Sequence, residues 1–387
     1  MNMILSTIGT SLLTHKVNDQ ERFFLNKYAN FSYEDIPKDD LSALTQFIDR
    51  AKNRLNNQDL NEIQKLSAEL NGILSYYQND LSNKRNDYHL LIATDTYEGK
   101  ETALLVKEFL DRYNMLVEVK VIKGLKTDNT QSFTDGVKKL IAYLFENIEG
   151  YEEVIFNLTG GFKAIQAYLN TVGMFLANKL IYLFETGKLI NIPALPLKFD
   201  NYELMERYAS FFAMLDKQRN LDKNKFPNTL WDNISEIYYD EVQIDEQEIV
   251  SLSAWGMLMW EKQKDTIYAE NLINFPNIEY TQTYKNNFND CNNLDKIKLQ
   301  STIAELACLY NENNSLLKIK QHGGLQYSDY SSINFVNLKL GHFRITQARR
   351  VNCIEHSGKL YLLEYGEHSI ENNLNKYRNA ITQITKS

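Results

Sequence analysis

One short stretch of the chain has the residue types and spacing of a phosphate-binding turn: Thr159, Gly160, Gly161, Phe162 and Lys163. The apolar run 154–158 before it predicts a buried strand, and the apolar spacing over 162–175 predicts a helix. A strand that passes through glycines into a helix leaves backbone N–H groups with partial positive charge at the helix start, which suits a phosphate. Gly161 allows close approach, and Lys163 can add a point charge. An ordinary strand-to-helix turn has the same composition, so this alternative stays open.

Two more polar loops follow predicted strands: Gly9, Thr10 and Ser11 after strand 3–8, and Thr94, Asp95 and Thr96 after strand 88–94. Further strands are predicted at 116–122, 153–158 and 180–184, with helices at 102–113 and 133–145. Strands that alternate with helices indicate an α/β, Rossmann-like parallel sheet with helices on both faces. Ligands bind beyond the carboxyl ends of such strands, so the three loops are expected to converge there. The fingerprint GxGxxG is absent, which argues against NAD or FAD.

Residues 20–82 have helical apolar spacing and no visible chemistry, and they are interpreted as a helical insertion. Residues 188–200 contain Pro193 and Pro196 and are predicted to leave the sheet. A helix is expected at 202–215 and another at 249–264. Between them, residues 232–248 carry seven acids and no base. The domains are therefore assigned to residues 1–205, 206–272 (a helical and acidic linker) and 273–387.

The last segment is basic although the whole chain carries a net charge of −8. Residues 273–387 hold 13 Lys and Arg against 10 Asp and Glu, and 330–354 contain no acid. Such a surface suits a polyanion or is simply solvated. We also consider that the acidic run, including Asp240, Glu241, Asp245 and Glu246, shields it.

Two helices, 285–292 and 294–311, precede predicted strands at 332–338, 342–348, 350–356 and 359–365, with a short strand at 278–281 and a tight turn at Ser357-Gly358. This order predicts a small α+β domain with an antiparallel sheet. In the strand 342–348, Arg344 shares a face with His342, opposite Phe343 and Ile345.

A length of 387 residues is enough for two domains. Cys291, Cys308 and Cys353 form neither a disulfide framework nor a zinc motif, and no metal site is expected. No apolar run is long enough for a membrane span, and residues 1–13 have the pattern of a strand rather than a signal peptide. A reducing cytoplasm is the expected location.

The stretch 6–13 together with 157–163 resembles the CARF domains of CRISPR-associated proteins, over roughly residues 1–205. The resemblance implies a homodimer that binds a cyclic oligoadenylate, with cyclic tetra-adenylate as the expected activator. The ligand-binding residues would then be the three loops named above. A ring of phosphates suits glycine-rich backbone and helix N-termini, and a two-fold ring suits an isologous dimer.

Some CARF domains, the ring nucleases, also cut their ligand without a metal, through attack of a ribose 2′-OH on the adjacent phosphate. The residues that match theirs here are Ser11 and Lys163. Binding without cutting and binding with cutting both remain open.

The stretches 340–345, 357–363 and 366–368 resemble RelE toxins, over about 275–387. That resemblance implies ribosome-dependent mRNA cleavage with no metal. Its catalytic candidates are Arg344 for phosphate charge, with Arg349 or Arg350 as a second phosphate contact, Lys339 and His368 for proton transfer, and Tyr377 for stacking or proton transfer. Plain contact with the RNA backbone is the alternative for the basic residues, and a structural hydrogen bond for His368. Lys376-Tyr377-Arg378 lies further from the last strand than in the family, which puts Tyr377 in question.

The combination resembles CARF–RelE mRNA interferases, in which ligand binding to the dimer activates cutting of mRNA on ribosomes. The alternatives are a dedicated ring nuclease, a ligand-responsive transcription regulator, and a nuclease that cuts free RNA without a ribosome.

Overall fold

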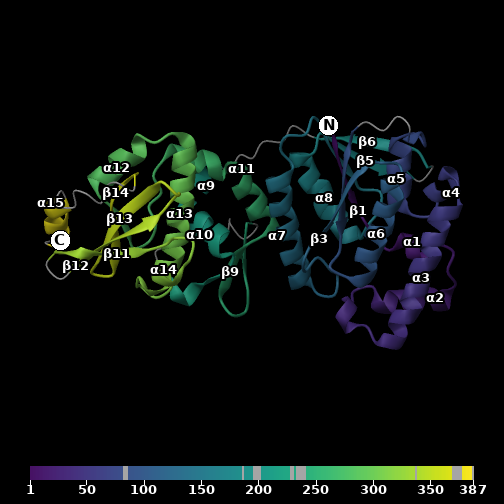
Figure 1. The fold of residues 1–387 in the computed structure, drawn as a ribbon, viewed down its shortest axis with the longest axis horizontal. Helices are drawn as coiled ribbons and strands as arrows, with labels where there is room; N and C mark the ends of the chain where they lie inside the picture. Colours follow the sequence, from purple (N-terminus) through teal and green to yellow (C-terminus); the bar gives the residue numbers. More distant parts are fainter. Residues whose placement is uncertain are drawn as a thin grey trace. The chain divides into compact units, whose positions relative to one another are not determined.

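The computed structural model of this chain describes residues 1–81, 86–184, 187–194, 202–226, 231, 241–335, 338–367 and 377–385, with side chains left undescribed at 331–335 and 378. Its internal contacts divide it into two units, Met1–Lys198 and Phe199–Ser387 (Figure 1). Each unit is described by itself.

The first unit is built on a six-stranded sheet in the order β3-β2-β1-β4-β5-β6. The strands are β1 (Met3–Thr7), β2 (Tyr88–Ala93), β3 (Leu116–Val121), β4 (Val154–Asn157), β5 (Lys179–Leu183) and β6 (Leu189–Pro193). The first five run parallel, which confirms the predicted α/β class. The chain moves outward from β1 to β3 and then returns to β4 on the other side of β1. The gap between β1 and β4 is therefore the switch point of the sheet.

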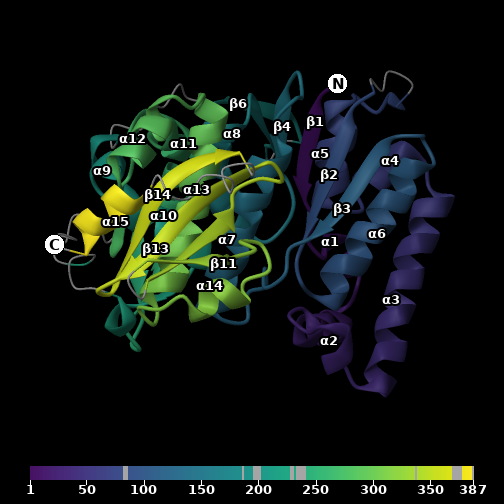
Figure 2. The same ribbon diagram turned by 60° about the vertical axis from the view of Figure 1, so that its left-hand side comes forward.

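Helices cover both faces of this sheet (Figure 2). One face carries α7 (Thr130–Asn147) and α8 (Lys163–Leu176), and the other carries α6 (Tyr97–Asp111) and the predicted helical insertion. The insertion consists of α1 (Ser11–Thr14), α2 (Asp19–Tyr28), η1 (Tyr33–Asp35), α3 (Lys38–Asn57), α4 (Leu60–Gln64) and α5 (Ala68–Tyr76). Its apolar residues share one core with the sheet, for example Phe47 and Leu70 with Ile4 and Ile155.

Strand β6 corrects the prediction that residues 188–200 leave the sheet. Residues 189–193 pair antiparallel with β5, from Leu189 opposite Leu183 to Pro193 opposite Lys179. A proline is tolerated here because β6 is the last strand of the sheet in the described part of the chain, so that its missing N–H faces no further strand.

The second unit contains a five-stranded sheet in the order β10-β14-β13-β12-β11. Its strands are β10 (Ile278–Tyr280), β11 (Ser328–Phe335), β12 (Leu338–Arg344), β13 (Arg349–His356) and β14 (Lys359–Glu367). The last four are antiparallel as predicted, whereas β10 pairs parallel with β14. The helices are α9 (Tyr202–Arg207), α10 (Ala209–Gln218), α11 (Ala254–Glu270), α12 (Gln282–Asn289), α13 (Asn293–Asn311), α14 (Leu317–Gln321) and α15 (Arg378–Ile384). The helix expected over 202–215 is thus two helices, and the strand expected over 342–348 ends at Arg344.

The helix expected over 249–264 was wrong at its start. Residues Ile249–Leu252 form β9, the centre of a small sheet with β7 (Leu221–Asp222) and β8 (Val242–Ile244), and η3 (Lys223–Lys225) follows β7. The helix α11 begins at Ala254 because the Ser253 side chain accepts a hydrogen bond from Gly256 N at 3.0 Å. A short, mostly apolar run before a cap fits a strand and a helix equally well, and pairing with the neighbouring strands decided between them.

The described part of the segment 206–272 packs within the second unit. The Trp260 ring stacks on Phe212 with centroids 5.9 Å apart, and the Cys308 thiol donates to Met214 O at 3.3 Å. Of the acidic run, 232–240, including Asp240, lie outside the described residues. The Glu241 backbone carbonyl accepts from Ser253 N, and the Asp245 carboxylate accepts from Gln247 N and Ile249 N, so the acid group of Asp245 has local structural partners.

Glu98, in the first turn of α6, gives the first unit a pH-dependent stability. Its side chain is 1% exposed, and both carboxyl oxygens lack a hydrogen-bond partner among the described residues. Burial raises the pKa of this carboxyl to about 8, from an ordinary value of 4.5. The folded chain therefore holds the proton more tightly, and the stabilisation is lost as the pH rises from about 5 to about 8.

We expect Glu98→Gln to flatten the fall of melting temperature between about pH 5 and pH 8, because the amide has no proton to lose. Thermal melts followed by circular dichroism measure this slope. Glu108→Gln on the same helix is the control, since Glu108 is exposed and paired with Lys52 at the surface. An unchanged slope in Glu98→Gln would show that other groups control this pH range.

Candidate functional site

A pocket of about 350 Å³ lies at the carboxyl ends of β1 and β4. Its lining residues are Gly9, Thr10, Ser11, Thr14, Arg22, Asn26, Ala68, Glu69, Thr159, Gly160, Gly161 and Phe162. Two of the three predicted loops therefore meet at the switch point. The remaining wall comes from α2 and α5 of the insertion, which sequence reasoning did not assign to the site.

The third predicted loop, 94–96, does not line this pocket. It follows β2, on the far side of β1 from β4, and Asp95 and Thr96 line a separate pocket of about 540 Å³ together with Ser32, Tyr33, Glu34, Tyr97, Lys100, Glu101 and Val121. Thr94 is 1% exposed, and its hydroxyl lies 3.0 Å from that of Thr96. Thr96 caps α6 by accepting from Gly99 N at 3.1 Å. These threonines therefore have local structural roles.

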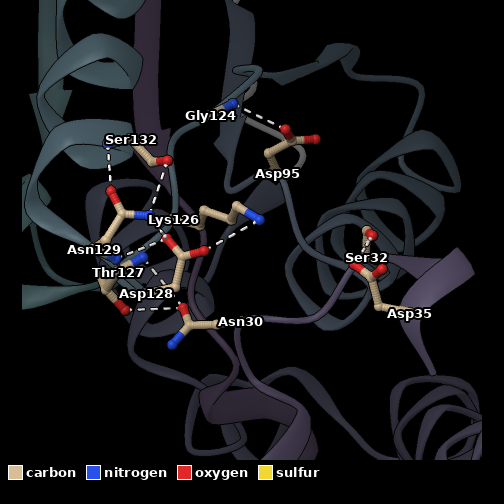
Figure 3. A network of polar contacts seen from close by, with 10 residues as sticks. All are labelled: Asn30, Ser32, Asp35, Asp95, Gly124, Lys126, Thr127, Asp128, Asn129 and Ser132. Atoms are coloured by element: carbon tan, nitrogen blue, oxygen red, sulfur yellow. Dashed lines mark hydrogen bonds and ion pairs between the residues drawn. The ribbon is translucent and has the colours of Figure 1, made fainter.

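Figure 3 shows how Asp95 and the loop after β3 are held. Gly124 N donates to Asp95 Oδ2 at 2.9 Å. Thr127 donates twice to Asn30 Oδ1, from its N–H at 3.1 Å and from its hydroxyl at 3.0 Å. Asn129 then caps α7 by accepting from Ser132 N at 2.7 Å. Asn30 thus ties this loop to the insertion.

The turn 159–161 and the loop after β1 direct three donors to one point, Gly9 N, Gly161 N and the Ser11 hydroxyl, and this group of donors is called the nest below. Gly161 has a backbone φ of +102°, which residues with a side chain rarely adopt, and a Cβ at this position would lie 2.7 Å from Thr7 Oγ1. The Thr7 hydroxyl donates to Gly160 O, which fixes the turn against β1. Helix α8 starts at Lys163 without a side-chain cap, so the first N–H groups of the helix remain available.

Glu69, from the first turn of α5, occupies this nest. Its Oε1 accepts from Gly9 N at 2.8 Å and from Gly161 N at 3.0 Å, and its Oε2 accepts from the Ser11 hydroxyl at 2.7 Å. The side chain is 1% exposed. Glu69 is also the only charged residue over 66–79, and this isolation within an apolar stretch was the signal in the sequence that could have pointed to it.

The two ring-nuclease candidates differ in position. Ser11 is the first residue of α1 and lines the pocket. Lys163 is exposed at the first residue of α8 and is not among the lining residues. The cation that does line the pocket is Arg22 of α2, which sequence reasoning missed because it lies in the insertion.

Within the part of the chain that the structure describes, no cluster of three or more His, Cys, Asp or Glu side chains is placed to hold a metal ion. The helices of this part include none with both the length and the apolar character needed to cross a bilayer.

In the second unit, β12 and β13 place the candidate cations on two faces of the sheet. Phe343 and Ile345 are buried, while His342 and Arg344 on the alternate face are partly exposed, as predicted. Arg344 pairs with Arg350 across the strands. By the alternation of side chains along a strand, Lys339 and Arg349 point to the other face. The Arg349 guanidinium lies over the Tyr365 ring there, at 5.7 Å from its centroid.

Arg350 is on the same face as Arg344 but serves the backbone. It is 7% exposed, and its Nη1 donates to the carbonyl oxygens of Thr346 at 2.7 Å, Gln347 at 3.3 Å and Arg349 at 3.0 Å. These bonds close the connection between β12 and β13. Arg350 therefore fixes the turn beside Arg344.

A chain of polar contacts crosses the Arg344 face of the sheet. The His342 ring lies 4.7 Å from that of Tyr330, and the Tyr330 hydroxyl donates to Asn352 Oδ1 at 2.8 Å. Asn352 Nδ2 donates to the Tyr377 hydroxyl at 2.8 Å, and this hydroxyl donates to Glu364. Sequence reasoning missed the participation of Tyr330, Asn352 and Glu364 because their strands pair only in the fold.

Tyr377 directly precedes α15 and is 4% exposed, packed with Ile381 against Leu340. Burial, followed by the hydrogen bond to Glu364, raises the pKa of its phenol. In this conformation it is placed to support the sheet face rather than to stack on a base. His368 and Lys376 lie outside the described residues.

The chain thus combines an α/β unit, with a glycine nest at its switch point, and a mixed α+β unit with a partly exposed arginine on its sheet. The profile of a family described as CRISPR-associated protein (Cas_APE2256) matches residues 64–195. This match lies within the first unit and includes Glu69 and the turn 159–161, but not Gly9–Ser11. The match supports the interpretation that this chain is a CRISPR-associated protein.

Proposed function

We propose that this chain is a CRISPR-associated sensor and effector, whose first unit binds a cyclic oligoadenylate and whose second unit cuts mRNA. The observation that carries the proposal is the nest of backbone N–H groups at the β1–β4 switch point, of which Gly161 N and its acceptor Glu69 lie in the region that matches a CRISPR-associated family. Such a nest suits phosphate rather than an apolar ligand.

In this proposal the ligand is cyclic tetra-adenylate bound across a homodimer. Each protomer presents one pocket to one half of the ring, so that a two-fold ring meets a two-fold protein. The start of α8 and the guanidinium of Arg22 attract phosphate, and Lys163 adds positive charge at the same helix end. The ligand is an activator and not a cofactor.

The second unit acts as a RelE-like ribonuclease on translating ribosomes. An mRNA 2′-OH attacks the adjacent phosphorus, its proton passes to a base, and the 5′-oxygen leaves with a proton, giving a 2′,3′-cyclic phosphate. In this proposal Arg344 stabilises the charge that develops on the phosphate oxygens, and its partial exposure at the end of β12 supports this role. Lys339 and Arg349 lie on the opposite face of the sheet. Any contact that they make with RNA is therefore not at the phosphate that Arg344 binds.

A second candidate function is ring cleavage by the first unit, which the position of Ser11 in the pocket favours. The same transesterification would then open the activator and end the response. Linear adenylate products would separate this activity from binding alone, and their loss in Ser11→Ala would place it in this pocket.

The test of the main proposal is a titration of the purified chain of residues 1–387 with cyclic tetra-adenylate, in a translating extract and with naked RNA. We expect cleavage of mRNA in the extract only when the ring is added, and little or none of naked RNA. Ring-dependent cleavage of naked RNA would show that cleavage does not require the ribosome. If calorimetry detects no binding of the ring to the chain, the proposed sensor role is wrong.

A further inference from the structure

The donors that make the turn at β1 and β4 suitable for a phosphate are already engaged by an anion of the chain itself. Gly9 N, Gly161 N and the Ser11 hydroxyl all donate to the Glu69 carboxylate. A carboxylate with three such bonds, two of them from backbone N–H groups, is a close electrostatic equivalent of a bound phosphate oxygen pair.

The turn is shaped around this carboxylate. A Cβ at Gly160 would lie 2.3 Å from Glu69 Cδ, so only glycine leaves space for it. Glu69 is not needed to cap its own helix, because Ser67 accepts from Leu70 N at 3.1 Å and caps α5. Its three partners come from residues far away in the sequence, on the loops after β1 and β4.

Two anions cannot share these donors, because like charges in contact repel strongly where water is excluded. A ligand phosphate can therefore enter the nest only when Glu69 leaves it. Displacing Glu69 breaks its three bonds to the loops, so that entry of the ligand removes these side-chain links between α5 and the loops after β1 and β4.

We propose that Glu69 is an internal competitor for phosphate, and that it sets the specificity of the pocket. The inference rests on the proposed function and deepens it. A single phosphate gains too few contacts to expel Glu69. A ring with several phosphates gains further contacts at the start of α8 and at Arg22, and it displaces the carboxylate. Glu69 thereby selects a cyclic oligonucleotide over inorganic phosphate or a mononucleotide.

Glu69→Gln tests this competition. The glutamine amide retains the shape of the side chain, with its oxygen facing the two glycine N–H groups and its nitrogen facing Ser11, but it removes the charge. We expect the variant to bind cyclic tetra-adenylate about tenfold more tightly or better in calorimetry, because charged hydrogen bonds are roughly twice as strong as neutral ones. We also expect it to gain thermal stabilisation by inorganic phosphate, which the unmodified chain lacks.

The matched control is Glu62→Gln, which makes the same charge change in the insertion at an exposed residue paired with Lys65. It should bind the ring as the unmodified chain does. If Glu69→Gln does not fold, Glu69→Asp provides the second variant. It keeps the charge but shortens the side chain, and it should also bind the ring more tightly.

The possible results separate this inference from the proposed function. If the unmodified chain binds the ring and the Glu69 variants bind it equally or more weakly, Glu69 is a structural clamp and the inference is overturned, while the sensor function stands. If no protein binds the ring, the sensor function fails. Thermal melts with and without inorganic phosphate then test the role of Glu69. Stabilisation of Glu69→Gln but not of the unmodified chain supports competition between Glu69 and phosphate, and no stabilisation of Glu69→Gln overturns this inference.

Discussion

Arg344→Ala is expected to slow ring-dependent cleavage of mRNA in a translating extract by about 10²- to 10³-fold. Removal of one preorganised group that stabilises transition-state charge typically costs this much. Arg344 is partly exposed and ends β12, and the pairing with Arg350 holds its strand in place. The measurement is the rate of mRNA cleavage at saturating cyclic tetra-adenylate, with binding of the ring measured in parallel and expected to be unchanged.

The control for this variant is Lys298→Ala, which removes an exposed cation from α13 in the same unit and should cut at the normal rate. Arg350→Ala separates the structural role from the chemical one. Because Arg350 is buried and its three bonds close a turn, this variant should lose thermal stability, whereas Arg344→Ala should melt normally. Normal cleavage by Arg344→Ala would remove Arg344 from the catalytic assignment.

Gly161→Ala is expected to eliminate binding of cyclic tetra-adenylate and to lower the free energy of unfolding by about 1–3 kcal/mol. The backbone at this position has φ +102, which alanine adopts only under strain, and the new Cβ would lie 2.7 Å from Thr7 Oγ1 and 2.8 Å from Thr7 Cβ. Either the turn shifts or β1 does, and both changes break the nest. Chemical unfolding and calorimetry measure the two effects.

Gly150→Ala is the matched control, because Gly150 also has a positive φ of +91 but a Cβ there meets nothing within 4 Å. It should lose a similar increment of stability from backbone strain and keep its affinity for the ring. If Gly161→Ala bound the ring as well as Gly150→Ala does, the nest at β1 and β4 would not be the phosphate site.

The parallel sheet of the first unit could be predicted because its central strands β1, β2 and β4 are short, buried and mostly apolar, and because helices with clear spacing separate the strands. The same signal failed at 249–252, where a short, mostly apolar run precedes a capped helix. It also failed at β6, where two prolines argued for a loop. In both places the strand exists because a neighbouring strand supplies its hydrogen bonds, and the sequence of one segment does not contain that information.

The sequence predicted the parts of the site that have a local cause and missed those that depend on contacts between distant residues. Glycines that need a left-handed conformation have a local cause, so the turn 159–161 was found. Glu69 was missed because its partners are 60, 92 and 58 residues away in the sequence. Sequence analysis also missed that Lys339 and Arg349 lie on the opposite face of the sheet from Arg344. β12 starts and ends earlier than its apolar pattern indicated, so Lys339 belongs to the same strand as Arg344, and Arg350 rather than Arg349 lies opposite Arg344.

The parallel pairing of β10 with β14 has a consequence for how the protein is made. β14 is the last strand of the described chain and lies between β10 and β13, so the sheet is incomplete until residues up to 367 have left the exit tunnel. Domains generally fold in the order of their synthesis. A nascent chain therefore acquires a folded first unit well before the five-stranded sheet of the second unit is complete. Under the proposed function, the elongating ribosome would carry a folded sensor before it carries a nuclease.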